Sequence, residues 1–197
     1  MSLFEVYPDI ISEVPGTIPF EFGVEQRSLV THFENGSEQR RLIDISPRRN
    51  VKLYYTAITQ AQAQTLHTFY RGTYGTLESF YFVFPQEKTI VDELAGRCTY
   101  IGQSQLKVPS RYATYHGLKR NGVVTTNYTF YSYPYSGPTD LVSLNFAANI
   151  GDVFHWTFVG RLIIRARFAE GALTFSDIKN FTSSLTVDLV SVQNTLE

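Results

Sequence analysis

The segment from Glu34 to Pro85 constrains the fold of this chain more than any other, because its pieces specify local structures in a fixed order. Asn35-Gly36 separates two strand-like runs, Val24–Phe33 and Glu38–Ile45. Both turn residues tolerate the positive φ angle that a tight hairpin demands, so we predict a hairpin here. No catalytic group stands out in the segment, which favours an assembly component over an enzyme.

A strand, a helix and an aromatic strand follow this hairpin. The run Val51–Ile58 alternates apolar and polar residues, which predicts a half-buried strand with Val51, Leu53, Tyr55 and Ala57 on its inner face. Thr59-Gln60-Ala61-Gln62 has the form of a capping box, so a helix should begin at Gln60 and run to about Arg71. Its apolar side is marked by Ala63, Leu66, Phe69 and Tyr70.

The end of that helix carries two glycines. Gly72 is the expected left-handed C-cap, and Gly75 releases the chain into Leu77–Phe84. This last run is rich in aromatic and β-branched residues, which predicts a strand covered on both faces. By contrast, Met1–Gly23 contains Pro8, Pro15 and Pro19, which indicates an extended arm or loop.

Short strands and turn residues dominate the chain from Thr89 onward, and Asn121-Gly122 predicts a second hairpin turn. The strands expected there are Arg97–Ile101, Gln105–Val108, His116–Arg120, Val123–Val124, Tyr128–Tyr133, Leu141–Phe146, Val153–Phe158 and Arg161–Phe168. A turn or short helix is expected over Ser176–Phe181, and a last strand ends near Val192.

Composition narrows the class of protein. The 197 residues suit one domain, or one domain with a smaller insertion, and 43% apolar with 18% charged residues suits a folded core. Cys98 is the only cysteine, so we exclude an internal disulfide and a cysteine-based zinc site, and expect Cys98 to be a buried filler. A net charge of −1 argues against binding to nucleic acid or an anionic membrane through overall positive charge.

The start of the chain lacks the pattern of a secretory signal, and no stretch reaches the length of a membrane helix. We therefore expect the protein to fold in a reducing cytoplasm.

The sequence shows no pattern typical of a catalytic, metal or cofactor site. Its four histidines, His32, His67, His116 and His155, have no paired ligand spacing, and no Gly-x-Ser-x-Gly elbow or phosphate loop occurs. A Ser-His-Asp triad converges only in space, so the sequence leaves that arrangement open. We predict no enzyme activity, no metal and no cofactor.

Arginines supply the candidate interface residues. Acidic Glu34, Glu38 and Asp44 interleave with the first two arginine pairs, a pattern that suits ion pairing across a subunit contact better than phosphate capture. On Arg161–Phe168 a period of two places the arginines on one face and Leu162, Ile164, Ala166 and Phe168 on the other. That arginine row is either a solvated outer face or a contact with an acidic neighbour. The candidate subunit-interface residues are Arg40, Arg41, Arg48, Arg49, Arg161, Arg165 and Arg167.

Several short motifs are shared with a known family. They are Gly36 before Glu38-Gln39-Arg40, the strand Val51–Ile58, Phe69 with Gly72 and Gly75, and Ser79-Phe80-Tyr81-Phe82 ending at Pro85. Later come Gly151-Asp152-Val153-Phe154, Ala166-Arg167-Phe168, Leu173 and Leu189-Val190-Ser191-Val192. On these motifs the chain resembles the distal tail proteins of long-tailed phages and gene transfer agents, and more distantly the minor tail proteins of lambda-like phages. It departs from the pattern at Gly16-Thr17-Ile18-Pro19, where a glycine-richer lead is usual.

The resemblance implies a mainly β fold with one short helix. Its β-barrel or sandwich core would be the ring-forming domain, residues 1–88 and 160–197, with a second β module inserted over residues 89–159. It also implies a virion protein of the tail tip that forms a ring, hexameric in the family, and joins the tail tube, the tape-measure protein and the baseplate hub. DNA would pass through the lumen without specific binding, and no membrane would be involved.

The alternative is a carbohydrate- or receptor-binding module. The expected insertion is rich in aromatic residues, which serve as platforms for sugars or, more commonly, as core and interface packing. The residues in question are Tyr128, Phe130, Tyr131, Tyr133, Tyr135 and Trp156.

Overall fold

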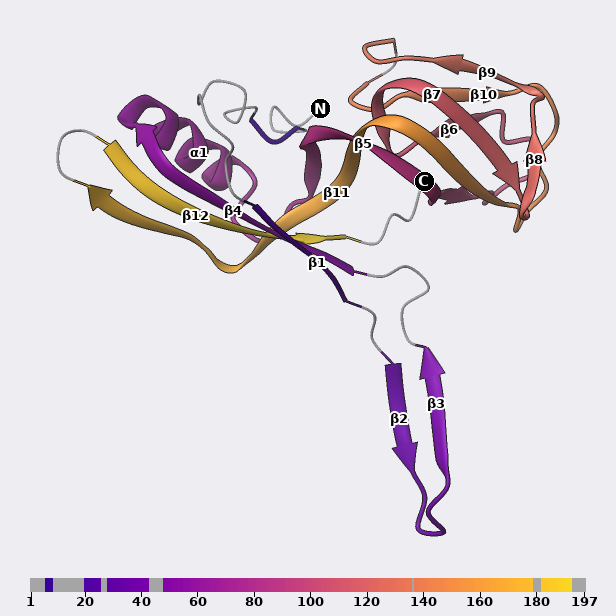
Figure 1. Cartoon of the computed structure of the whole chain (residues 1–197), viewed down its shortest axis with the longest axis horizontal. Helices are drawn as coiled ribbons and strands as arrows, with labels where there is room; N and C mark the ends of the chain where they lie inside the picture. The colour runs from indigo at the N-terminus through magenta and orange to yellow at the C-terminus, as the bar shows by residue number, and fades with distance from the viewer. Residues whose placement is uncertain are drawn as a thin grey trace. The chain divides into compact units, whose positions relative to one another are not determined.

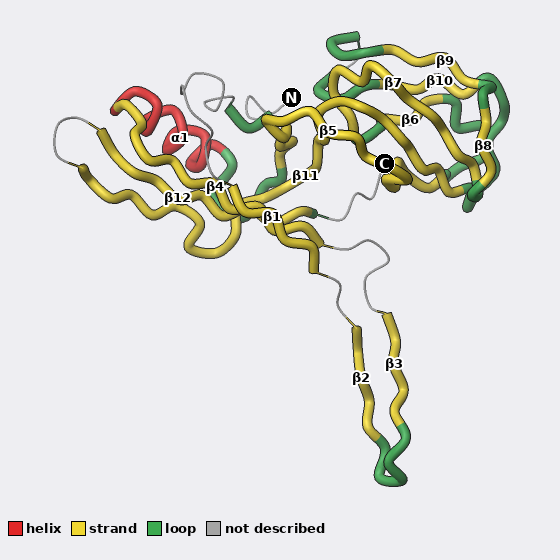
Figure 2. The backbone as a smooth tube through the Cα atoms, viewed as in Figure 1, coloured by secondary structure: helices red, strands yellow, loops and turns green. Residues whose placement is uncertain are grey.

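The computed structural model describes residues 6–8, 20–25, 28–42, 48–135, 137–178 and 182–192. It confirms the predicted class: the fold is mainly β, with a barrel- or sandwich-like core, a second β module and a single short helix in the described part of the chain (Figures 1 and 2). The chain divides into two compact units. One contains Pro8–Ser79 and Ala166–Gln193, and the other contains Glu5–Tyr7 and Phe80–Arg165. The expected limits of the inserted module, 89 and 159, fall inside the second unit.

In the first unit, four antiparallel strands lie side by side in the order β1 (Phe20–Glu25), β4 (Arg48–Thr59), β12 (Thr182–Ser191) and β11 (Val153–Ile178). Only the later part of β11, from Ala166, pairs with β12. The alternation predicted for β4 is confirmed, because Val51, Leu53 and Tyr55 are all buried. The side chain of Ala57 lies outside the described residues.

Helix α1 (Gln60–Gly72) packs on β4 and β12 of the same unit. The predicted capping box is present: the Thr59 amide donates to Gln62 Oε1 at 2.9 Å, and the Gln62 amide donates to Thr59 Oγ1 at 3.3 Å. Leu66 and Phe69 are buried, and the Phe69 ring meets Phe168 edge-on. The prediction of Gly72 as a left-handed cap is wrong. Gly72 is still helical, and the positive φ angles occur later, at Tyr74 and Gly75.

The predicted first hairpin is confirmed as β2 (Ser28–His32) paired with β3 (Glu38–Leu42). Its turn differs from the expectation, because Gly36 has a positive φ of 79° while Asn35 does not. The Gly36 amide donates to Phe33 O, and the Asn35 side chain accepts from the Ser37 amide.

The strand boundaries around this hairpin also differ from the expectation. Val24 belongs to β1 and not to the hairpin strand, and β1 begins at Phe20 within the segment predicted as an arm or loop. Residues 26–27 and 43–47, together with most of the first 19, lie outside the described residues, as do the predictions made for them.

The second unit contains β5 (Phe80–Arg97), β6 (Gln105–Lys107), β7 (Ser110–Arg120), β8 (Val123–Thr125), β9 (Tyr128–Tyr131), β10 (Leu141–Leu144) and the first part of β11. Strand β7 pairs with both β11 and β8, β5 pairs with β11, and β6, β10 and β9 form a separate three-stranded sheet. The hairpin predicted at Asn121-Gly122 is confirmed: both residues have positive φ, and Arg120 pairs directly with Val123.

Several predicted boundaries in this unit are wrong. Strand β5 continues unbroken to Arg97, and its first part alternates between buried Phe80, Phe82 and Phe84 and half-buried neighbours, so only one face is fully covered. The segment predicted as strand Arg97–Ile101 is mainly loop and turn. Strand β11 runs through Gly160 without a break and, at its far end, as far as Ile178, where a turn was expected.

The core of the second unit lies beneath β11. Phe154, Trp156 and Phe158 alternate along that strand and are fully buried. Cys98 is buried as predicted, and its thiol donates to the Tyr100 carbonyl at 2.9 Å. This packing fixes β7, which pairs with β11.

Candidate functional site

The β2–β3 hairpin exposes apolar side chains. All five residues of β2 are exposed, and Leu29 and Phe33 leave 53% and 47% of their surfaces uncovered. Val30 is also exposed. A two-stranded hairpin with no covered face is marginally stable in water. The exposed apolar residues of this hairpin therefore indicate a surface that contacts another molecule.

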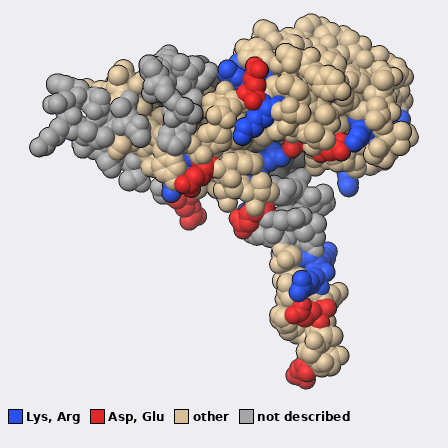
Figure 3. Space-filling model, in the orientation of Figure 1, with Lys and Arg blue, Asp and Glu red and all other residues tan. Residues whose placement is uncertain are grey.

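Charged side chains of both signs lie on the same hairpin (Figure 3). Arg40 donates from Nε and Nη2 to Glu38 Oε2, at 3.2 and 3.0 Å, and His32 Nδ1 lies 3.4 Å from the other oxygen of that carboxylate. Arg41 is opposite Leu29 and forms no ion pair with a described residue. Because Arg40 and Arg41 are successive strand residues, they point to opposite faces and do not form one basic patch.

Arg48 and Arg49 open β4, within the first unit. They pair in register with Glu25 and Val24 of β1, and the Arg49 amide donates to Ser191 Oγ at 2.7 Å. Both side chains are half-buried. These two residues are thus built into the sheet rather than presented as a basic patch.

The three arginines of β11 do not act as one row. Arg161 lies opposite Arg111 of β7, Arg165 lies with its guanidinium carbon 5.5 Å from the centre of the Tyr81 ring, and Arg167 donates from Nη1 to the Thr76 carbonyl at 3.4 Å. Arg161 and Arg165 belong to the second unit and Arg167 to the first. Leu162, Ile164, Ala166 and Phe168 are buried, as the alternation predicted, but Ile163 on the arginine face is buried as well.

Arg111 was not predicted from the sequence. Its guanidinium lies 3.7 Å from the centre of the Tyr133 ring and 5.4 Å from that of Tyr112, and these two rings meet edge to face at 5.3 Å. Such cation–π contacts hold an arginine in place without neutralising its charge. A single arginine between Ser110 and Tyr112 carries no sequence pattern that would have singled it out.

A buried carboxylate organises this surface. Asp140 is fully buried, and its two oxygens accept from the Ser110 hydroxyl at 2.7 Å and from the amides of Tyr133, Ala113 and Tyr112 at 2.7, 3.1 and 3.2 Å. Trp156 Nε1 donates to the same Ser110 oxygen. Four donors on one carboxylate satisfy a charge that would otherwise be costly to bury. Asp140 therefore ties the start of β7, which carries Tyr112, to the loop that carries Tyr133.

The aromatic residues considered as a sugar platform are divided between core and surface. Trp156 is fully buried and lies parallel to the His116 ring, so it is not a platform. Burial lowers the pKa of His116 below its ordinary value, and nearby Asp140 opposes that shift more weakly. Tyr135 is 68% exposed and stacks on Tyr131 with ring centres 4.4 Å apart.

The described residues contain no group of three His, Cys, Asp or Glu side chains that could hold a metal ion. Within the same part of the chain, no helix has the length and hydropathy needed to cross a membrane. Comparison with the models of known protein families gives no match, and no curated protein matches the chain either.

Proposed function

We propose that this chain is a structural virion protein of a phage tail tip. It forms a hexameric ring that joins the tail tube to the tape-measure protein and the baseplate hub, and it leaves a channel through which DNA passes. Support comes from the motifs shared with distal tail proteins and from the mainly β fold. In this proposal the chain makes and breaks no covalent bond, and its role is geometric.

The exposed β2–β3 hairpin is the observation that carries the proposal. Leu29 of β2 and Phe33, just after that strand, lie uncovered on a hairpin whose strands pair only with each other among the described residues, while Val30 is exposed on the face opposite to Leu29. A neighbouring copy that covered them would stabilise the hairpin by removing apolar surface from water, at about 25 cal/mol per Å². A closed ring needs two different, mutually matching faces on every subunit, and the hairpin would supply one of them.

Charge on the hairpin suits the same role. Glu38 and Arg40 already pair with each other, while Arg41 forms no ion pair with a described residue. An arginine at an interface pairs well with a carboxylate of the neighbour, because its planar fork matches the two oxygens. An acidic residue of the next copy is the partner that the proposal expects for Arg41.

The test is the mass of the purified protein in solution, together with negative-stain images. We expect a closed ring of six copies with a central hole. The double variant L29S/F33S should remain folded by circular dichroism but lose the ring. V123S, which alters an exposed valine in the second unit, should keep it. A wild-type protein that stays monomeric at micromolar concentration would refute the proposal.

Receptor or glycan binding is the second candidate. It is favoured by exposed tyrosines of the second unit, among them Tyr112, Tyr115 and Tyr135, since aromatic faces stack against sugar rings. A glycan array decides this candidate: binding that Tyr135→Ala weakens at least tenfold would support it, and an array with no signal would remove it.

A further inference from the structure

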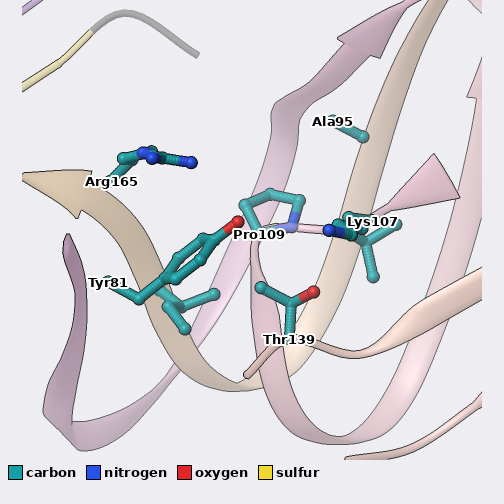
Figure 4. Close-up of a pocket in the computed structure, with 8 residues that line it drawn as sticks. Tyr81, Ala95, Lys107, Pro109, Thr139 and Arg165 are labelled. Atoms are coloured by element: carbon teal, nitrogen blue, oxygen red, sulfur yellow. The ribbon is translucent and has the colours of Figure 1, made fainter. Parts of the chain in front are cut away.

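A small cavity in the second unit has the chemistry of an anion site. Its volume is about 20 Å³, and it lies where β5, β6 and β11 meet the loop before β10 (Figure 4). The residues that line it include Tyr81, Lys107, Pro109, Thr139, Ile163 and Arg165. All of them belong to one compact unit, so the cavity does not depend on how the two units are arranged.

The Thr139 hydroxyl is the first reason to expect a ligand. Thr139 is only 4% exposed, and its Oγ1 has no hydrogen-bond partner among the described residues. Figure 4 shows this side chain pointing toward Pro109, with the hydroxyl oxygen on the side of Lys107. A buried hydroxyl without a partner is costly, and native proteins rarely leave one unsatisfied. The cavity that it lines is the space in which a partner would sit.

Positive charge is the second reason. Lys107 contributes its chain from β6 and Arg165 from β11, and no acidic side chain is among the described residues that line the cavity. The Tyr81 ring lies beside Arg165, and its hydroxyl points toward Pro109 in Figure 4. Lys107 and Arg165 can only donate hydrogen bonds, and the two hydroxyl groups can donate as well, so the lining suits a ligand that accepts hydrogen bonds and carries negative charge.

The size of the cavity selects among such ligands. A cavity of 20 Å³ exceeds the roughly 10–15 Å³ that one water molecule requires, but it does not provide for a second molecule of that size. Neither a whole phosphate nor a whole carboxylate fits inside, but one oxygen of either could enter. A tetrahedral phosphate would then leave three oxygens outside the cavity, whereas a planar carboxylate leaves only one for the two cations. Arginine and lysine beside the mouth would then face the second oxygen and share the negative charge.

We propose that this cavity binds a carboxylate. One oxygen enters and accepts a hydrogen bond from Thr139 Oγ1, and the group's charge is balanced by Lys107 and Arg165. The site goes beyond the proposed function and exists whether or not the chain forms a ring. Its ligand is either a free small carboxylate or the side chain of a glutamate or aspartate on a partner polypeptide.

Ligand-observed NMR tests the site with acetate as the probe, at constant pH and ionic strength. We expect saturable saturation transfer to the acetate methyl group. T139V, which removes the hydroxyl while keeping the shape, should weaken acetate binding at least fivefold, as should K107Q and R165Q. R71Q, which removes an exposed cation from the first unit, should change it less than twofold.

The variants also separate binding from folding. Because the Thr139 hydroxyl has no partner, T139V should unfold at the same urea concentration as the wild type or a higher one. Transfer that does not saturate, or that persists unchanged in T139V, would overturn the proposal.

A second arm identifies the source of the carboxylate by comparing N-acetyl-Gly-Glu-Gly-amide with its glutamine counterpart. Binding of the glutamate peptide at least fivefold more tightly than acetate supports the carboxylate site and assigns it to a partner polypeptide. Binding equal to or weaker than that of acetate supports the site and assigns it to a free small carboxylate. If the glutamine peptide binds as tightly as the glutamate peptide, no carboxylate is recognised and the proposal fails.

Discussion

Arg111 of β7 and Arg161 of β11 lie directly opposite each other across an antiparallel pair of strands. The Nε atoms of both are buried and have no hydrogen-bond partner in the part of the chain that the structure describes. Like charges in this position repel each other. Contact between the Arg111 guanidinium and the Tyr133 ring offsets part of that cost, since the ring face attracts a cation.

Removing one member of this pair should stabilise the protein. We expect Arg161→Gln to raise the free energy of unfolding by about 0.5 kcal/mol in low salt, and less in 1 M salt, where the repulsion is screened. Urea denaturation of R161Q, R111Q and the double variant forms a double-mutant cycle. A coupling energy of the opposite sign, showing that the two arginines attract, would contradict the repulsion.

Loss of the Asp140 charge should be far more costly. Asp140→Asn places an NH₂ donor among four groups that already donate to this side chain, so we expect the free energy of unfolding to fall by about 3 kcal/mol. Urea denaturation measures this decrease in the free energy of unfolding. The control is Asp92→Asn, which breaks a largely exposed pair with Lys119 and should cost less than about 1 kcal/mol.

His116 should make stability depend on pH. Its pKa is lowered in the folded state by burial, within a cluster where its ring stacks on Trp156 and its Nδ1 lies 3.0 Å from the Tyr128 hydroxyl. The unfolded chain therefore binds the proton first as pH falls through about 6.5, and stability decreases from there until the folded-state pKa is passed.

Unfolding free energies measured between pH 8 and pH 5 should show this decrease in the wild type. His116→Phe keeps an aromatic ring in the stack and removes the titrating group, so the decrease should become smaller. An unchanged pH profile in H116F would assign the effect to another group.

The capping box predicts a local effect. Thr59→Ala removes the acceptor of the Gln62 amide and should lower the free energy of unfolding by about 1 kcal/mol. The matched control is Thr65→Ala on the same helix, whose hydroxyl only bonds back to the Ala61 carbonyl. Because alanine is the better helix former, T65A should be neutral or slightly stabilising. Equal losses in T59A and T65A would argue against a specific cap.

The predictions that hold are those set by neighbouring residues. The cap at Thr59 and the turn at Asn121-Gly122 depend on chemistry within four residues, and the burial of Val51, Leu53 and Tyr55 depends on a period of two. Where a strand ends is decided by its partner instead. Val153–Phe158 and Arg161–Phe168 were predicted as two strands, yet β11 continues through Gly160. An added Cβ there would lie 3.1 Å from the Ala113 backbone, so glycine permits close approach to β7.

The charged surface was harder to predict for the same reason. Periodicity placed Arg161 and Arg165 on one face, but no local pattern says that Arg111 lies opposite the first and Tyr81 beside the second. Asp140 follows Gly137-Pro138-Thr139 in what reads as an ordinary turn, although its carboxylate binds residues from Ser110 to Tyr133. Contacts between distant segments of the chain set these roles.

Strand β11 continues from Phe80–Arg165 into Ala166–Gln193 without a linker. Its buried side chains include Phe154, Trp156 and Phe158 before that boundary and Ala166 and Phe168 after it, each set spaced two residues apart. A single residue inserted beside Arg165 would therefore exchange the two faces of the strand downstream and turn Phe168 toward solvent, whereas two inserted residues would restore the original order. If recombination replaced the second unit by that of a related chain, the number of residues added or lost in β11 would therefore have to be even. A flexible linker between two modules imposes no such condition on length.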